Sequence, residues 1–125
     1  MSLIGIIASS KFIDTSVKII ALGDSSNTIS RSSDGITYTT ATLPATGAWT
    51  SGAYGDKWFI VDNTNQNGAT STDGITWTTR SLSSSTTWYA SAYGGGTYVA
   101  TATGGTTASS STDAISWTGR TLPSS

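Results

Sequence analysis

Short apolar runs alternate with longer polar stretches along the whole chain, and this pattern predicts strands separated by loops. The clearest runs are Val17–Leu22, Lys57–Asp62 and Thr97–Thr101. Each is rich in β-branched or aromatic residues and is bounded by Gly, Asn or Ser, as strands are. No stretch shows an extended apolar period of 3.6 residues, and Ser, Thr and Gly are poor helix formers. The sequence therefore predicts an all-β chain with almost no helix.

A repeated stretch of eight residues is superimposed on this pattern. It runs from Ser71 to Thr78 (STDGITWT), with related copies at residues 32–39 and 111–118. The aspartates of the three copies, Asp34, Asp73 and Asp113, lie 39 and 40 residues apart. A fixed period of this length is typical of repeat architectures.

Alignment of the three copies predicts a unit of four strands. The first strand is Trp49–Tyr54 in the second unit and Trp88–Tyr93 in the third. In the first unit the corresponding strand would be Lys11–Thr15, which is a weaker match. The units end near a leucine, and proline follows at Pro44 and Pro123, as expected at strand exits. The predicted boundaries are residues 10–43, 44–82 and 83–125, with residues 1–9 left over as an extra N-terminal strand.

The repeated aspartates predict hairpin turns. A carboxylate can accept hydrogen bonds from backbone N–H groups two or three positions on, and a following glycine takes a positive φ. Ala114 replaces that glycine, so the third turn should be more strained or of another type. A metal site is disfavoured, because each turn brings one carboxylate and hard cations need several oxygen ligands. The residues expected to build the turns are Ser32, Asp34, Gly35, Tyr38, Ser71, Asp73, Gly74, Trp77, Ser111, Asp113 and Trp117.

The pattern Ser-x-Asp-Gly-Ile-Thr-Trp resembles the Asp-box, or BNR-like, repeat of sialidase-type and related β-propellers. The resemblance covers residues from about 10 to 122, although the usual box has one residue between the aspartate and the glycine. It implies about three four-stranded antiparallel propeller-like blades per chain, in an incomplete ring. Similar Ser/Thr/Gly-rich repeats occur in phage tail and virion proteins. The resemblance therefore implies a structural or attachment protein of a phage-like virion.

Three blades are too few to close a ring, because propellers typically use about four to eight. An open arc exposes apolar blade faces and strand edges, which favours association. We therefore expect a homo-oligomer, with two chains supplying about six blades, since closed symmetry is the common outcome for such assemblies. Other virion proteins are the further partners expected.

Composition excludes several functional classes. The formal net charge is −1, charged residues make up 10% of the chain, and the basic residues do not cluster, which argues against a nucleic-acid surface. There is no cysteine for a disulfide and no histidine to serve as the usual base for a serine nucleophile. The chain also has no glutamate, so the sialidase activity cannot be carried over. We expect a protein that is not an enzyme and has no cofactor and no metal.

Ligand binding is the alternative from a different class. The polar loop 62–67 carries Asp62, Asn63, Asn65 and Asn67, and amides suit hydrogen bonding to sugar hydroxyls. Loops on rigid scaffolds often bind ligands. Trp49 and Trp88 could stack on a sugar or belong to the core. These residues predict a carbohydrate-binding, lectin-like propeller. The alternative is that residues 62–67 form a solvent-exposed loop without a ligand. The corresponding loop of the first unit is residues 24–27.

The N-terminal run Leu3–Ala8 is apolar but too short to span a bilayer, and no basic segment precedes it. We therefore expect a strand rather than a signal peptide or a membrane segment. The expected location is the virion, after release from the cell.

Overall fold

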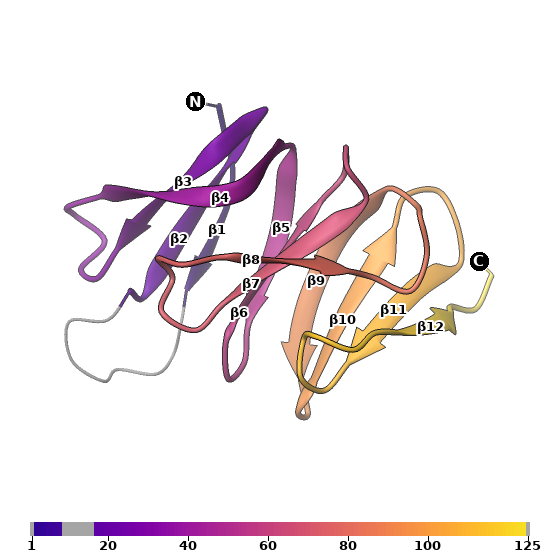
Figure 1. The fold of residues 1–125 in the computed structure, drawn as a ribbon. Helices are drawn as coiled ribbons and strands as arrows, with labels where there is room; N and C mark the ends of the chain where they lie inside the picture. Colours follow the sequence, from indigo (N-terminus) through magenta and orange to yellow (C-terminus); the bar gives the residue numbers. More distant parts are fainter. Residues whose placement is uncertain (1, 9–16, 125) are drawn as a thin grey trace.

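The computed structural model describes residues 2–8 and 17–124, and every regular element within these ranges is a β-strand (Figure 1). Blade 1 contains β1 (Ser2–Ala8), β2 (Ile19–Asp24), β3 (Ser26–Ser32) and β4 (Thr39–Gly47). Blade 2 contains β5 (Trp49–Tyr54), β6 (Trp58–Asp62), β7 (Asn67–Ser71) and β8 (Thr78–Ser81). Blade 3 contains β9 (Trp88–Gly94), β10 (Thr97–Ala102), β11 (Thr107–Ser111) and β12 (Thr118–Thr121). The prediction of an all-β chain with three four-stranded blades is confirmed.

Each blade is an antiparallel sheet whose strands pair in chain order. The first strands of successive blades are neighbours, because β5 contacts both β1 and β9. The Ser91 amide donates a hydrogen bond of 3.0 Å to the Ser51 hydroxyl, which joins β9 to β5. The blades follow one another as an open arc, with β1, β5 and β9 on its inner side and β4, β8 and β12 as the last strand of each sheet (Figure 1). Hairpin connections and short strands produce this meander without crossovers.

The N-terminal run is the first strand of blade 1, and the prediction of an extra strand is wrong. Strand β1 pairs antiparallel with β2 along its whole length, with Leu3 opposite Gly23 and Ala8 opposite Ile19. Blade 1 therefore begins at Ser2 and not at residue 10. The segment Lys11–Thr15, which was expected in this place, lies outside the described residues. The error arose because this strand carries no Trp or Ala-Tyr-Gly marker, so alignment of the repeats missed it.

The last strands of the blades also differ from the prediction. The Asp turns extend through residues 77 and 117, so β8 and β12 start at Thr78 and Thr118 rather than at the preceding isoleucines. Strand β4 continues past Leu43 and includes Pro44. The register of the β3–β4 pairing shifts between Ser26, which lies opposite Gly47, and Thr28, which lies opposite Thr42. The segment of β4 between Thr42 and Gly47 is longer than the facing segment of β3, so it bulges. A bulge on an edge strand tolerates proline, because no ladder hydrogen bond is required there.

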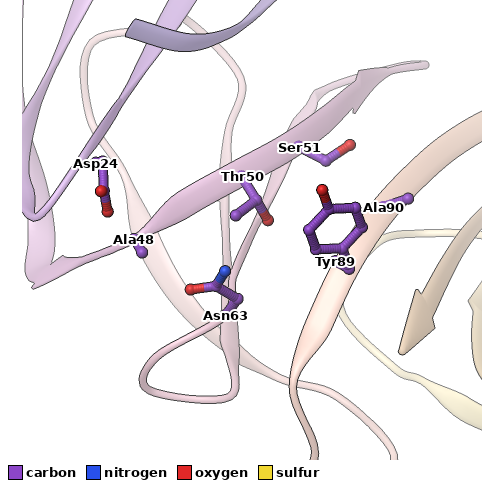
Figure 2. A pocket seen from close by; sticks show the side chains of 7 residues that line it. All are labelled: Asp24, Ala48, Thr50, Ser51, Asn63, Tyr89 and Ala90. Carbon is purple, nitrogen blue, oxygen red and sulfur yellow. The ribbon is translucent and has the colours of Figure 1, made fainter. Parts of the chain in front are cut away.

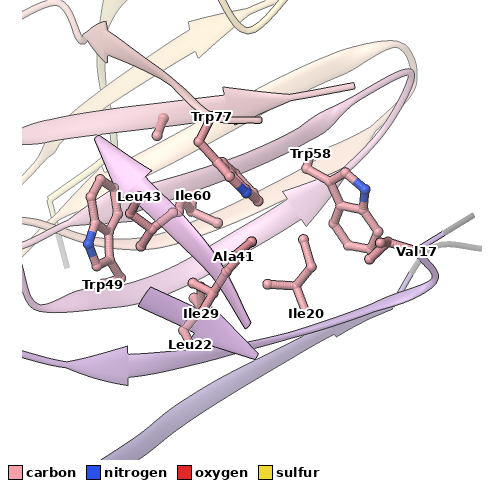
Figure 3. Close-up of a cluster of buried hydrophobic side chains, with 11 residues drawn as sticks. Val17, Ile20, Leu22, Ile29, Ala41, Leu43, Trp49, Trp58, Ile60 and Trp77 are labelled. Carbon is pink, nitrogen blue, oxygen red and sulfur yellow. The ribbon is translucent and has the colours of Figure 1, made fainter. Parts of the chain in front are cut away.

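The core lies between blades rather than within one sheet. The first cluster joins blades 1 and 2 and contains Val17, Ile20, Leu22, Ile29, Ala41, Leu43, Trp49, Trp58, Ile60, Ala69 and Trp77 (Figure 3). The second joins blades 2 and 3 and contains Ala53, Phe59, Val61, Trp88, Tyr98, Ala100 and Ala114. All five residues of β6 are buried, because blade 1 covers one face of blade 2 and blade 3 covers the other. Each blade therefore depends on its neighbours for burial.

The Asp turn of each later blade packs against the blade before it. Gly74 in the turn of blade 2 is buried against Val17, which precedes β2. Lys57, which precedes β6, donates a hydrogen bond of 2.9 Å to the backbone carbonyl of Asp113 in the turn of blade 3. No blade precedes the turn of blade 1 in the described chain, and Gly35 there is exposed. The turns thus fasten one blade to the next.

We expect Gly74→Ala to destabilise the protein more than Gly35→Ala. Both glycines have positive φ, 71° and 77°, so alanine costs about 1–2 kcal/mol at either position. A Cβ on Gly74 would lie 2.8 Å from Cγ1 of Val17, whereas one on Gly35 would lie 3.3 Å from the terminal Cδ1 of Ile19. Overpacking should therefore add about 1–3 kcal/mol at Gly74 only. Urea denaturation followed by circular dichroism measures both losses, and equal losses would contradict docking of the second turn on blade 1.

Candidate functional site

Each Asp turn is closed by one carboxylate oxygen and one serine hydroxyl. In blade 2, Oδ1 of Asp73 accepts hydrogen bonds of 2.8 Å from the amides of both Ile75 and Thr76. The Ser71 hydroxyl donates to the same oxygen at 2.9 Å and accepts from the Gly74 amide at 2.8 Å. The predicted bonding to amides two and three positions on is confirmed.

The other two turns repeat these contacts. Asp34 and Asp113 each accept from the amides two and three positions on, at 2.8 and 2.9 Å. Ser32 and Ser111 donate to these carboxylates at 3.0 and 2.8 Å. Ala114 has φ 58°, so the third turn keeps the glycine-like conformation and is strained, not of another type. Its methyl group is fully buried in the second cluster, which offsets part of that strain.

The aromatic residue at the end of each turn contributes to the contact between blades. Trp77 is buried in the first cluster. Trp117 is partly buried and packs on Phe59 of blade 2, with 4.5 Å between ring centroids. Tyr38, the corresponding residue of blade 1, is 44% exposed. The tryptophans therefore pack on neighbouring blades as well as over their own hairpins.

Hydrogen bonds to the charged form lower the pKa of all three turn aspartates. The amides of Ser116 and Ile115, with the Ser111 hydroxyl, lower the pKa of Asp113 to about 2. The pKa of Asp34 is lowered for the same reasons. At Asp73 partial burial opposes the shift, but the hydrogen bonds outweigh it and the pKa is still lowered. These carboxylates are structural anions, and each is already occupied by its own turn.

The polar loop predicted to bind ligand is held together by its own aspartate. Asp62 is 1% exposed, and its carboxylate accepts from the Thr64 amide at 2.9 Å and the Thr64 hydroxyl at 2.7 Å. The amide and Nδ2 of Asn65 donate to the other carboxylate oxygen at 3.1 and 2.7 Å. Nδ2 of Asn65 also donates to the Thr46 carbonyl at 2.7 Å. Asp62 and Asn65 therefore fix the loop to the end of β4, and Asp62 is not accessible to a ligand.

The other residues predicted to bind ligand divide between core and surface. Trp49 and Trp88 are 1% and 0% exposed, so of the two alternatives left open for them they belong to the core and cannot stack on a sugar. Asn67 is half-buried at the start of β7. Asn63 lines a groove that is described below. In blade 1 the corresponding loop is reduced to a tight turn at Ser25, which has φ 53°.

An open groove of about 450 Å³ lies on the inner side of the arc, where β5 and β9 meet. Its lining residues are Asp24, Ala48, Thr50, Ser51, Asn63, Tyr89 and Ala90. Figure 2 shows Thr50 on β5, with Asp24 to one side and Tyr89 on β9 to the other. The Tyr89 side chain is 60% exposed, whereas Oγ1 of Thr50 is buried and has no hydrogen-bond partner. The groove thus combines an accessible aromatic ring with several polar groups.

The inner strands carry a β-bulge at the same place in each blade. The pairing skips Ile4 in β1, Thr50 in β5 and Tyr89 in β9. A bulge re-aims its extra side chain, and the bulges of β5 and β9 supply Thr50 and Tyr89 to the groove. Sequence alignment missed these residues, because the repeat keeps no common residue type at the bulge. The only signal was Tyr89 itself, an aromatic residue next to a tryptophan.

Within residues 2–8 and 17–124, no three or more His, Cys, Asp or Glu residues gather where they could hold a metal ion. The same part of the chain has no helix with the length and apolar character that a membrane span requires.

No protein-family model matches the sequence, and neither does any curated protein. Among solved structures, the chain is similar to YCF48 bound to a D1 peptide, with 17% identity and a TM-score of 0.74, over 97% of this chain and 41% of that one. Virginiamycin B lyase from Staphylococcus aureus has 15% identity and a TM-score of 0.78, over 98% and 42% of the two chains. A streptogramin B lyase has 13% identity and a TM-score of 0.79, over 98% and 41%. The chain therefore spans less than half the length of these propeller proteins.

Two of these neighbours are lyases, and this finding contradicts the expectation that the chain is not an enzyme. It relied on the missing histidine and glutamate, but the same fold carries catalysis in other proteins. At 13% and 15% identity the likeness shows the fold alone, and it assigns no catalytic residue to this chain.

We expect Asp113→Asn to flatten the acid dependence of stability. The pKa of Asp113 in the folded protein is about 2, below the ordinary 3.8, so its stabilising effect is present above 3.8 and is lost as the pH falls toward 2. The variant should be less stable at neutral pH and should lose less further stability on acidification. Urea denaturation midpoints across this pH range measure the effect. Asp24→Asn is the control, since the Asp24 carboxylate accepts a hydrogen bond of 3.3 Å from the Ser25 hydroxyl but none from a backbone amide of the described chain. Identical pH profiles for D113N and the parent would contradict the assignment.

Proposed function

We propose that the chain is a structural or attachment subunit that acts by assembly, such as a phage-like virion component would. One copy docks the open face of its blade 1 on the open face of blade 3 in the next copy. The observation that carries the proposal is that both end faces expose apolar residues whose counterparts are buried inside the chain. Burial of such surface is the main driving force of association.

The open face of blade 1 exposes the Asp turn. Ile36 is 85% exposed, whereas Ile75 and Ile115 at the same place in the other turns are each 47% exposed. Tyr38 is 44% exposed, whereas Trp77 is 8% exposed. The difference arises because the later turns pack on a preceding blade. A preceding blade supplied by another copy would cover Ile36 and Tyr38 in the same way.

The open face of blade 3 exposes the complementary surface. Leu122 is 38% exposed, although Leu43, its counterpart counted from the turn aspartate, is 3% exposed. Val99 is half-buried, while Phe59, at the same register in blade 2, is fully buried beneath Trp117. Repetition of the contact between blades 2 and 3 would set Tyr38 of one copy on Val99 and Leu122 of the next.

Two chains joined in this way supply six blades, within the usual range of about four to eight. The contact is head-to-tail, and such contacts close into a ring when the rotation per subunit permits. The propeller neighbours are more than twice as long as this chain, which covers 41% and 42% of them, so a second arc is of the size that closure requires.

We expect the protein to sediment as a dimer at micromolar concentrations. The variant Tyr38→Cys, Leu122→Cys should form disulfide-linked dimers under mild oxidation, because the parent chain has no cysteine to interfere. The matched control is Tyr38→Cys, Ser84→Cys, since Ser84 is exposed in the connection between β8 and β9. A folded monomer at these concentrations would overturn self-assembly. A dimer in which both cysteine pairs react equally would overturn the arrangement of the faces.

The second candidate function is binding of a carbohydrate in the inner groove, as in a lectin-like propeller. It is favoured by the accessible ring of Tyr89, which lines the groove together with the polar residues Asp24 and Ser51. A sugar supplies both an apolar face for the ring and hydroxyls for such polar groups. Asn63 from the predicted loop also lines this groove.

A glycan array would test the second candidate. If the groove binds sugar, Tyr89→Ala should weaken reproducible hits about two- to tenfold, since an aromatic contact contributes about 0.5–1.5 kcal/mol. Asn67→Ala is the control, because Asn67 does not line the groove. Hits that survive Tyr89→Ala, or an array without hits, would dismiss the groove as a sugar site.

A further inference from the structure

Each blade carries a pocket beside its Asp turn, and each pocket contains one arginine. The pockets measure about 150, 250 and 320 Å³ and contain Arg31, Arg80 and Arg120 in blades 1, 2 and 3. The rest of each lining is mostly serine and threonine hydroxyls at equivalent positions of the repeat. These pockets lie on the third and fourth strands of each blade, away from the groove on the first strands.

The arginine reaches this pocket from different strands in different blades. Arg80 on β8 donates from Nε to the Thr70 hydroxyl on β7 at 2.8 Å, and Arg120 on β12 donates likewise to Ser110 at 2.8 Å. In blade 1, Arg31 occupies the place that Thr70 and Ser110 have in blades 2 and 3. The strand pairing shows this equivalence: Arg31 lies opposite Thr39, Thr70 opposite Thr78, and Ser110 opposite Thr118. Ala41 then occupies the place of Arg80, seven residues after the turn aspartate.

The repeat therefore keeps a guanidinium in this pocket even where the sequence moves it to the adjacent strand. From the sequence the three arginines do not align, and only their common pocket relates them. A purely structural arginine would be expected to keep one position, since its partner hydroxyl is also fixed by the repeat. The shared feature is a cation among hydroxyl groups.

Among the residues that the structure describes, no carboxylate lines any of the three pockets. The described residues form one ion pair, Lys57 with Asp56, so it involves none of these arginines. Nε of Arg31 is buried without a hydrogen-bond partner. The guanidinium of Arg31 lines its pocket and has no carboxylate partner in the described chain, so an anion from outside would be a favourable partner for its charge.

We propose that the three pockets are binding sites for oxyanions, that is for sulfate, phosphate or carboxylate groups. A guanidinium binds such groups through paired charged hydrogen bonds, and serine and threonine hydroxyls can donate to the remaining oxygens. Three equivalent sites on one arc suit a polymer that repeats the anionic group, because the sites would then bind with avidity. The proposal does not depend on self-assembly, since every pocket lies within one blade and its immediate neighbours.

The test is calorimetric titration of the full chain with sodium sulfate at constant ionic strength, and with dextran sulfate against unsulfated dextran. Arg31→Gln, Arg80→Gln and Arg120→Gln should each remove one site, and the triple variant should bind sulfate at least about tenfold more weakly, as expected for loss of a charged hydrogen bond. The control Lys18→Gln removes the same charge, and Lys18 lines none of the pockets. It should bind like the parent.

The two ligands distinguish the source of the anion. Binding of sulfate alone supports sites for free anions, and stronger binding of dextran sulfate supports a polymer. Equal weakening by Lys18→Gln and the triple variant would show a diffuse charge effect and overturn the proposal, as would no binding of either sulfated ligand. Circular dichroism of Arg120→Gln, whose side chain is exposed, checks that lost binding is not lost folding.

Discussion

Burial of large side chains between successive sheets is the interaction on which the rest of this structure depends. Trp49, Trp58 and Trp77 of blade 2 pack on blade 1, while Phe59 and Val61 of the same blade pack toward blade 3. Alternate residues of one strand thus enter two different cores, as the two-residue period of a strand requires. A blade that is covered on one side alone exposes apolar residues on its other face, and this is the case for the blades at both ends of the arc.

The Asp turns connect this burial to local chemistry. Within a turn, one carboxylate satisfies backbone amides that no strand partner could reach. The same turn then presents a small residue, Gly74 or Ala114, to the preceding blade, where a larger residue would not fit. Ala114 shows which requirement is stronger, because the chain accepts a positive φ at an alanine and keeps the turn. The same turn residues therefore provide both the local hydrogen bonds and the packing between blades.

Features that suggest ligand binding occur where the strand pairing or the repeated sequence is irregular. The bulges in β5 and β9 direct Thr50 and Tyr89 into the inner groove. In blade 1, Arg31 stands where the other blades have a serine or threonine, and its Nε atom is buried without a hydrogen-bond partner. Neither feature contributes to the contacts that hold the blades together.

The sequence by itself determined the strand content, the period of the repeat and the chemistry of the Asp turns, because alternation and turn hydrogen bonds depend on residues close along the chain. Tertiary structure decided which surfaces are accessible. Asp62 became a buried fastener, Trp88 became core, and the N-terminal run became the first strand of blade 1. These outcomes follow from pairing and burial between segments far apart in sequence, about which a local pattern holds no information.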